Sequence, residues 1–516
     1  MDRDPVGEGA AQARVGLKAV SLRMPEPDAS VLSARAQIVA GLRRIVAGEG
    51  VIADDESLVA YESDGLTAYR QLPLAAVLPR TTEQVAQILK FCKSRGVKVV
   101  ARGAGTSLSG GALPLQDGVI LGLSRFNRIL EVDLENRVVV AQPGVTNLGI
   151  TEAVKRQGFY YAPDPSSQIA CSIGGNVAEN SGGVHCLKYG LTTNNVLGVE
   201  LVTMDGEVLH FGGRTLDAPG YDWLGVINGS EGMLGVITEV TVRILPRPQV
   251  ARAALLGFPS VESAGQCVAD IIGAGIIPAG MEMMDRLATL AAEEFLHVGY
   301  PLDVEAVLIV EADGVAGECD HVLDRVTEIA RVNGASVVRL STSEDERLRF
   351  WAGRKSAFPA VGRLSPDYYC MDGTIPRGQL ATVLRRMNEM SERHGLRVAN
   401  VFHAGDGNLH PLILYDANQP GQLERAEAFG AEILRMCVEV GGVLTGEHGV
   451  GVEKRDLMPE MFSETDLAQQ QRLKCAFDPD GLLNPGKVFP TLHRCAELGR
   501  VHVHGGRVAH PELPRF

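Results

Sequence analysis

A glycine-rich loop in the first half of the chain follows a buried strand but cannot lead directly into a helix. Residues 97–114 read VKVVARGAGTSLSGGALP. Gly103 and Gly105 begin a G-x-G-x-x-G pattern, but its sixth position is Leu108, and Pro114 with two nearby glycines prevents an immediate helix. A Rossmann site requires that helix, and the P-loop motif G-x-x-x-x-G-K-[ST] is absent, so neither is predicted. The glycines then either serve tight turns or let backbone N–H groups surround an anion such as pyrophosphate.

Two further stretches of the first half are also rich in glycine. Residues 163–190 read PDPSSQIACSIGGNVAENSGGVHCLKYG, and residues 229–238 read GSEGMLGVIT. Stretches with few large side chains pack poorly into a protein core, but they let backbone lie flat against a rigid planar ligand. Glycine supplies 59 of the 516 residues, above the usual ~7%. Three such stretches favour one extended cofactor over three unrelated turns.

Composition excludes several classes of partner and site. The net charge of −14 argues against a nucleic-acid partner and against a polybasic membrane anchor. The start MDRDPVGEGAAQ has no apolar signal region, and no apolar run approaches the ~18 residues that span a bilayer. The nine cysteines are scattered without a C-x-x-C motif. We therefore expect no disulfide scaffold, zinc ribbon or iron–sulfur site within the chain, and a reducing, cytoplasmic compartment.

Hydrophobic periodicity predicts an α+β chain. Residues 81–96 read as a helix with a capping box from Thr81 to Gln84, and residues 196–211 as a hairpin that turns at Met-Asp-Gly. Between residues 260 and 415 helices alternate with strands, which favours a sheet with helices on one face. The predicted units are an N-terminal helical segment (1–68), a first domain (69–248), a second domain (249–490) and a tail (491–516).

Two histidines enclose a turn-forming segment, HAGDGNLH, at residues 403–410. We expect a strand end, a tight turn and a second strand start, which would bring the two rings together. The segment TGEHGVG at 445–451 adds a carboxylate on another turn. His403, His410 and Glu447 then form a set suited to Zn²⁺, Mn²⁺ or Fe²⁺. The alternative is a histidine pair that is hydrogen-bonded for structural reasons only.

Two further side chains are candidate functional groups. An unperturbed imidazole titrates near ~6.5, which makes His448 a candidate general base. A fourth metal ligand or a core residue is the alternative for His448. Arg354 is the candidate for carboxylate recognition, because guanidinium binds carboxylate bidentately. Lys355 and Arg363 are its competitors.

The three glycine-rich stretches together resemble the vanillyl-alcohol-oxidase-type (PCMH) FAD-binding domain. The resemblance implies a two-part domain of that type, followed by a ferredoxin-like α+β substrate or cap domain. The first loop would hold the diphosphate, and the later stretches would line the flavin and adenine. Some members attach FAD through a histidine in the first loop, where this chain has Thr106, so we expect non-covalent FAD. The positions assigned to FAD are Arg102, Gly103, Ala104, Gly105, Thr106, Ser107, Ser109, Gly110, Pro163, Asp164, Gly174, Gly175, Asn176, Asn180, Gly182, Gly183, Glu231, Gly232, Gly235, Ile237 and Asn484.

The second half resembles flavin-dependent 2-hydroxy-acid dehydrogenases, which carry HxGDGNxH and GEHG. The resemblance implies that His403, His410 and Glu447 hold a divalent metal. The substrate would chelate the metal through its carboxylate and hydroxyl, and the cation would lower the hydroxyl pKa. His448 would take the hydroxyl proton while the Cα hydrogen leaves as hydride to the flavin.

The substrate is expected to be a small monocarboxylate such as glycolate or D-lactate. Relatives specific for dicarboxylates place polar groups where this chain has Phe358, Cys370 and Leu412. A second carboxylate buried there without a partner would cost several kcal/mol.

The stretches YESDGLTAYR, RKSAFPAVGRLSPDYYCMDGTIPR and PTLHRCAELG extend the resemblance to the FAD-binding subunits of bacterial glycolate oxidases. It implies a second flavin-type subunit and an iron–sulfur subunit as partners. It also implies a cytoplasmic location, peripheral on the inner face of the membrane only through those partners. The alternatives are a D-lactate dehydrogenase of the same fold that works as a single chain, a metallohydrolase, and a flavin-bearing subunit without catalysis.

Overall fold

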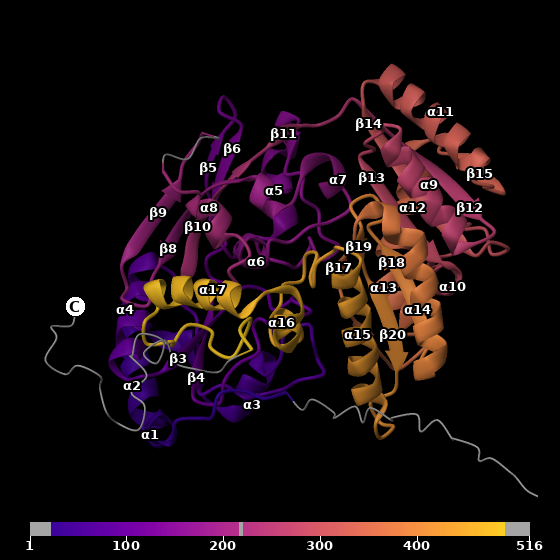
Figure 1. Cartoon of the computed structure of the whole chain (residues 1–516). Coiled ribbons are helices and arrows are strands. Elements are labelled where there is room, and N and C mark those ends of the chain that lie inside the picture. The colour runs from indigo at the N-terminus through magenta and orange to yellow at the C-terminus, as the bar shows by residue number, and fades with distance from the viewer. Residues whose placement is uncertain (1–21, 216–219, 491–516) are drawn as a thin grey trace, which may run out of the picture.

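Three larger β-sheets form the framework of the chain, which the computed structural model describes for residues 22–215 and 220–490. Figure 1 shows two of the sheets in a first lobe, in indigo and magenta, and the third in a second lobe, in rose and orange, called the cap lobe here. The predicted tail 491–516 and residues 1–21 of the predicted N-terminal segment lie outside the described residues.

The first sheet has four strands in the order β1-β2-β4-β3, of which β2, β4 and β3 are parallel. The helix α4 joins β2 to β3, and Thr81 caps it by accepting from the Gln84 amide at 3.2 Å, which confirms the predicted helix. Residues before 68 supply β1 and α2 to this sheet and its core, so the predicted boundary at 68 does not separate a unit. The elements are α2 (Arg35–Ile45), β1 (Val51–Ile52), β2 (Ala75–Val77), α4 (Thr82–Ser94), β3 (Lys98–Arg102) and β4 (Gly118–Gly122).

The second sheet is antiparallel, with five strands in the order β5-β6-β10-β8-β9. The predicted hairpin is confirmed, because β8 pairs with β9 and Val202 lies opposite Val208. Helices α5 and α6 pack on this sheet through Ile150 and Ile173. The elements are β5 (Ile129–Asp133), β6 (Val138–Ala141), α5 (Asn147–Val154), α6 (Ile173–Glu179), β8 (Val196–Val202), β9 (Val208–Gly212) and β10 (Val236–Arg243).

The cap lobe contains a seven-stranded antiparallel sheet, β15-β12-β14-β13-β18-β20-β16. Helices cover both of its faces, so the prediction of helices on one face is wrong. The reason is that successive strand residues such as Leu308 and Ile309 are both apolar and fully buried. The strands are β12 (Val250–Phe258), β13 (Gly280–Asp285), β14 (Ala306–Gly314), β15 (Val337–Leu340), β16 (Asp367–Cys370), β18 (Val398–Phe402) and β20 (Pro411–Tyr415). The helices are α9 (Val261–Gly273), α11 (Ala316–Val332), α14 (Leu380–His394) and α15 (Gln422–Glu439) on one face, and α10 (Arg286–Leu296), α12 (Glu344–Lys355) and α13 (Ala357–Val361) on the other.

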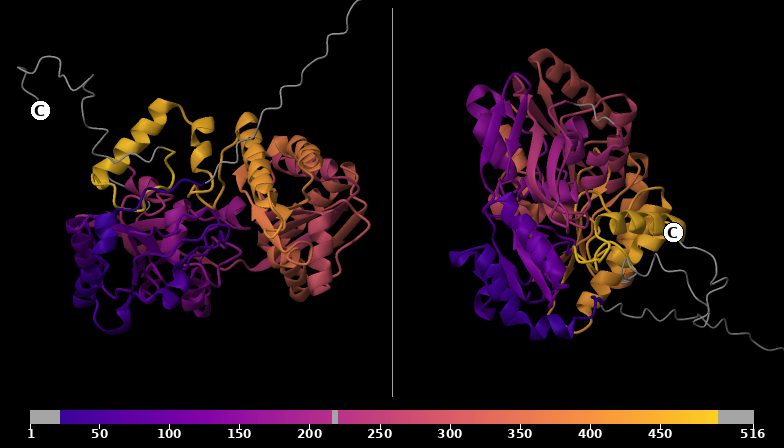
Figure 2. Two further views of the ribbon diagram at one scale, coloured as in Figure 1. Left: turned by 90° about the horizontal axis from the view of Figure 1, so that it is seen from below. Right: turned by 90° about the vertical axis from the view of Figure 1, so that its left-hand side faces the viewer.

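The C-terminal part of the chain returns to the first lobe, as the yellow ribbon in Figure 2 shows. In α17 (Glu464–Phe477), the buried Lys474 ammonium donates to the carbonyls of Met233 at 2.6 Å and Leu483 at 3.0 Å. Leu482 and Leu483 belong to the core of the first sheet, so this segment contacts the first lobe, although residues 464–488 fall within the predicted second domain. Shorter elements are α1 (Ala29–Ser33), α3 (Asp55–Leu58), β7 (Phe159–Tyr160), α7 (Cys186–Tyr189), α8 (Trp223–Ile227), β11 (Leu245–Pro246), β17 (Gly373–Thr374), β19 (Asn408–Leu409) and α16 (Met458–Met461). In the described part of the chain, every helix is too short or too polar to cross a bilayer.

Candidate active site

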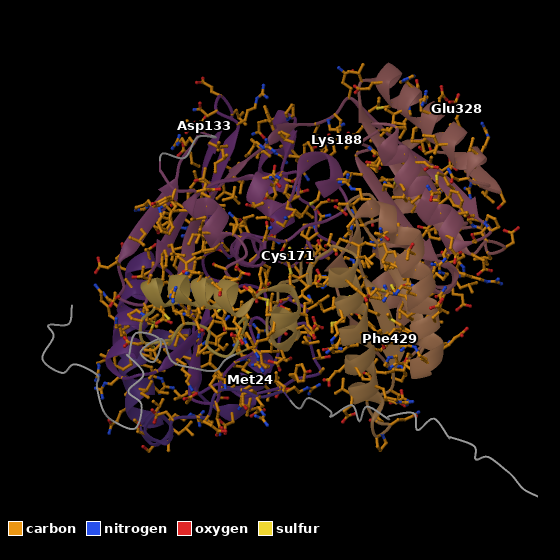
Figure 3. All side chains as sticks on the ribbon, viewed as in Figure 1. Met24, Asp133, Cys171, Lys188, Glu328 and Phe429 are labelled. Carbon is orange, nitrogen blue, oxygen red and sulfur yellow. The ribbon has the colours of Figure 1, made fainter. Side chains whose placement is uncertain are left out.

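A cavity of about 630 Å³ is lined by residues of both lobes. All three glycine-rich stretches contribute to its wall, and Cys171, which Figure 3 labels between the lobes, is one of the residues that line it. Of the positions predicted to bind FAD, those at the cavity wall are Arg102, Gly103, Ala104, Gly105, Thr106, Ser107, Gly174, Gly175, Asn176, Glu231, Gly232, Gly235 and Ile237.

The other predicted positions are not among the residues that line this cavity, and Asp164 lines a second one. Asp164 accepts from the ring Nδ1 of His185 at 2.9 Å, and Asn180 ends α6 with a left-handed backbone. Gly182 touches the other half of the site, because a Cβ there would lie 2.6 Å from Glu447 Oε2. These residues shape the wall rather than line it. The predicted positions not at the wall are Ser109, Gly110, Pro163, Asp164, Asn180, Gly182, Gly183 and Asn484.

The first glycine loop is shaped by one arginine. Arg102 folds back beneath the loop and donates to the Ser63 carbonyl at 2.6 Å. Gly105 has a φ of +72°, and a Cβ at this position would collide with the Arg102 guanidinium. The loop therefore requires glycine at this turn, and no helix follows it before β4.

Asn484 joins two of the glycine stretches from behind. Its amide Nδ2 donates to the Gly111 carbonyl at 2.9 Å and to the Glu231 carbonyl at 2.7 Å. Lys487, which is buried, donates to Asn484 Oδ1 at 2.7 Å. Burial lowers the pKa of Lys487 to about 7 despite the nearby carboxylates. The returning C-terminal segment thus fixes the spacing of the cavity wall without lining it.

The segment between the two histidines is a tight turn, as predicted. His403 and Asn408 form a bridge across it, and Gly407 has a φ of +81°. The two rings lie 4.9 Å apart, and the Nε2 atoms of His403 and His410 lie 3.4 Å and 3.2 Å from Glu447 Oε1. Three potential ligands from two separate loops therefore converge on one point.

Glu282 in β13 supports this set and was not anticipated from the sequence. Its Oε1 lies 2.7 Å from His403 Nδ1, and its Oε2 lies 2.7 Å from a terminal nitrogen of Arg354. Burial disfavours the imidazolium, but Glu282 and Glu447 outweigh it and raise the pKa of His403. The bond to Nδ1 orients the ring so that Nε2 faces Glu447.

Asp372 holds the turn that carries Glu447 and His448. Its Oδ2 accepts from the amides of Gly446, Glu447 and His448 at 2.9, 2.6 and 2.9 Å. Its Oδ1 accepts hydrogen bonds from the Lys454 ammonium and the Thr445 hydroxyl. A second possible ion group, made of Asp372, His410 and His448, is therefore less suited to a cation, because donors already surround this carboxylate.

His448 lines the cavity and lies parallel to His410, with ring centroids 4.9 Å apart. Its Nδ1 is 3.6 Å from Asp372 Oδ1. Burial is the main cause that lowers the pKa of His448 to about 4, so the ring is neutral at pH 7.

The basic residues differ in how they relate to the cavity. Arg354 is buried and paired with Glu282, whereas its neighbour Lys355 lines the cavity wall. Arg363 bonds the Glu294 carbonyl and lies over the ring of Phe295, away from the cavity.

Of the three positions predicted to set substrate size, only one lines the cavity. Phe358 lines the cavity, with its ring 5.9 Å from that of His410 and 6.1 Å from that of Tyr368. Cys370 and Leu412 lie opposite each other in β16 and β20 and are buried in the cap core, so these two positions do not line the cavity. Tyr368, two residues before Cys370, lines it instead.

The comparisons with known proteins identify the family of the chain. Residues 73–212 match the FAD binding domain, and residues 247–488 match the C-terminal domain of FAD linked oxidases. The chain therefore belongs to the FAD-linked oxidases and is an FAD-dependent oxidoreductase. It is 58% identical to the glycolate oxidase subunit GlcD of Escherichia coli K12, over 93% of this chain and 97% of that one. It is 37% identical to GlcD of Bacillus subtilis, over 84% and 92%, and 34% identical to D-lactate dehydrogenase of Archaeoglobus fulgidus, over 81% and 91%.

Solved structures show the same fold at low identity. The 4-ethylphenol oxidase of Gulosibacter chungangensis aligns with a TM-score of 0.74 and 20% identity, over 90% of this chain and 98% of that one. The p-cresol methylhydroxylase aligns with the same TM-score, 17% identity and the same coverage. The predicted PCMH-type α+β fold is thereby confirmed.

Replacement of Asn484 by Ala is expected to weaken FAD binding. The change removes two buried hydrogen bonds that join the first and third glycine stretches, each worth about 1 kcal/mol, so the dissociation constant of FAD should rise by about tenfold or more. Fluorescence titration of the apoprotein with FAD measures this. Asn136→Ala, on an exposed turn between β5 and β6, is the matched control, and equal affinities of both variants would contradict the prediction.

Proposed function

We propose that the chain oxidises a small 2-hydroxy acid to the 2-oxo acid, with FAD as the hydride acceptor. One observation carries the proposal: a single cavity is lined by the glycine stretches of the FAD domain and by His410, Glu447 and His448. The names of the relatives, glycolate oxidase subunit and D-lactate dehydrogenase, support the substrate class. Glycolate is preferred because the relatives of higher identity carry that name.

We further propose that His403, His410 and Glu447 hold a divalent cation, Zn²⁺, Mn²⁺ or Fe²⁺. The residues fit such an ion, because both Nε2 atoms converge on one carboxylate and Glu447 Oε2 is buried without a hydrogen-bond partner among the described residues. The bond from His403 to Glu282 is the kind of outer contact that fixes a metal-binding imidazole.

The proposed reaction uses both the bound groups and side chains of the protein. FAD supplies the hydride acceptor, and the cation supplies a Lewis acid that lowers the pKa of the substrate hydroxyl. His448 is proposed to accept the hydroxyl proton, since it is neutral at pH 7 and lies on the cavity wall. Asp372 keeps this residue in place by binding its backbone amide.

Arg354 is retained as the residue proposed to recognise the substrate carboxylate. Its Nε has no hydrogen-bond partner among the described residues, and Glu282 holds its guanidinium close to His403. Lys355 on the cavity wall is the second candidate.

We also propose non-covalent FAD, because Thr106 offers no imidazole for attachment. A second flavin-type subunit and an iron–sulfur subunit are proposed as partners, supported by the subunit name of the relatives and by the scattered cysteines, which suggest that the electrons leave through another chain. The proposed location is the cytoplasm, with contact to the inner face of the membrane only through those partners.

Anaerobic titration of the purified flavoprotein tests the reaction. Glycolate is expected to bleach the flavin absorbance more efficiently than D-lactate, and treatment with a metal chelator should abolish the bleaching. Bleaching by D-lactate alone would instead favour a D-lactate dehydrogenase that works as a single chain. No bleaching by any small 2-hydroxy acid would leave the proposal without support.

His403→Ala should lose the bound metal, because one of the three converging ligands is removed. Glu282→Gln should weaken metal affinity by about 10–100-fold, since it removes the carboxylate that orients His403. Elemental analysis after dialysis measures both. His321→Ala, on the exposed face of α11, is the control and should retain the metal, and a normal metal content in His403→Ala would rule out the proposed ligand set.

Phe358→Ala should broaden the substrate range. The ring stands beside His410 at the cavity wall, so its removal makes room for a longer side chain, and kcat/KM for 2-hydroxybutyrate relative to glycolate should rise by about tenfold. Steady-state kinetics with both acids measures the ratio. Phe295→Ala, whose ring is partly exposed in α10, is the control, and an unchanged ratio in Phe358→Ala would remove Phe358 from the substrate wall.

A further inference from the structure

Two carboxyl groups meet at the cavity wall and have no part in the chemistry described so far. Glu179 ends α6, and Glu231 belongs to the third glycine stretch. Both line the cavity. A Cβ placed on Gly449 would collide with Glu179 Oε2 and would lie 3.1 Å from Glu231 Oε1. The two carboxyl groups therefore lie close to each other, and both lie next to Gly449.

The surroundings favour the negative charge on Glu231. Its two oxygens accept from the amides of Val450 and Gly451, each at 2.7 Å. Glu179 Oε2 is buried and has no hydrogen-bond partner among the described residues. Two adjacent buried carboxyl groups do not ionise together, so the one with fewer donors keeps its proton.

The other charged groups near the pair do not reverse this assignment. Asp64 adds a further negative charge near Glu179, whereas Lys454 acts in the opposite direction. Lys454 and Lys487 also act on Glu231, and Arg102 lies near Asp64. Burial, followed by Glu231 and Asp64, raises the pKa of Glu179 well above its ordinary value.

We propose that Glu179 is a neutral acid at the wall of the flavin cavity, and that its ionisation lowers the reduction potential of the bound flavin. A negative charge in a cavity of low dielectric constant opposes the addition of electrons to a group beside it. Charge near the flavin ring is one of the means by which proteins adjust its electronics. The proposal rests on FAD binding and is independent of which acid the chain oxidises.

The midpoint potential of the bound flavin, measured without substrate by spectroelectrochemical titration between pH 6 and 10, tests this role. Where Glu179 ionises, the potential of the unchanged protein should fall more steeply with pH than that of Glu179→Gln. Glu179→Gln keeps the shape of the side chain but cannot ionise. The flavin potential of this variant should therefore equal that of the unchanged protein at low pH and lie above it at high pH. Glu179→Asp should keep a steep region. Glu135→Gln, on an exposed turn, is the control and should behave as the unchanged protein.

Parallel curves for the unchanged protein and Glu179→Gln would overturn the proposal. If Glu179→Gln fails to retain FAD, Glu179→Ser takes its place, and a curve parallel to that of the unchanged protein would equally overturn the proposal. Because no hydroxy acid is added, either result is independent of whether glycolate bleaches the flavin.

Discussion

The buried carboxylate of Asp372 fixes the part of the chain on which the site depends. Residues 446–448 belong to no helix or strand, yet one carboxylate oxygen accepts all three of their amides. Burial opposes its ionisation, but His448 and Lys454 outweigh this and lower the pKa of Asp372 to about 2. A permanent anion thus imposes one conformation on a glycine-rich turn. The Glu447 side chain can then meet the two imidazoles, and His448 can occupy the cavity wall.

Features that depend on local chemistry were predictable from the sequence. Gly110, Gly111 and Pro114 oppose a helix directly after the glycine loop that follows β3, and in the structure no helix follows the loop before β4. Gly407 permits the left-handed backbone of the turn between the histidines, and the Asp205–Gly206 pair does the same for the hairpin of β8 and β9. Such turns are specified within a few residues, so composition and spacing suffice to find them.

Features that depend on register and on distant partners were not predictable. Strand β13 has the sequence GMEMMD, without the β-branched residues that mark strands, and it carries the Glu282 that orients His403. Tyr368 and Cys370 share a face of β16, yet only Tyr368 reaches the cavity, because the two residues lie at different positions along the strand relative to the other lobe. The sequence resemblance pointed to the three glycine-rich stretches that contribute to the cavity wall. It did not distinguish wall residues such as Gly175 from supporting residues such as Asn180.

The return of residues 464–488 to the first lobe has a consequence for biosynthesis. The glycine stretches are synthesised early, whereas Asn484, which joins the first and third of them, and Lys474, which binds the third, are synthesised after the cap lobe. Until then the first lobe has its two sheets but lacks the segment that joins the glycine-rich loops by hydrogen bonds. The wall of the cavity is therefore complete only after the cap lobe, which lies between these segments in the sequence, has also been synthesised.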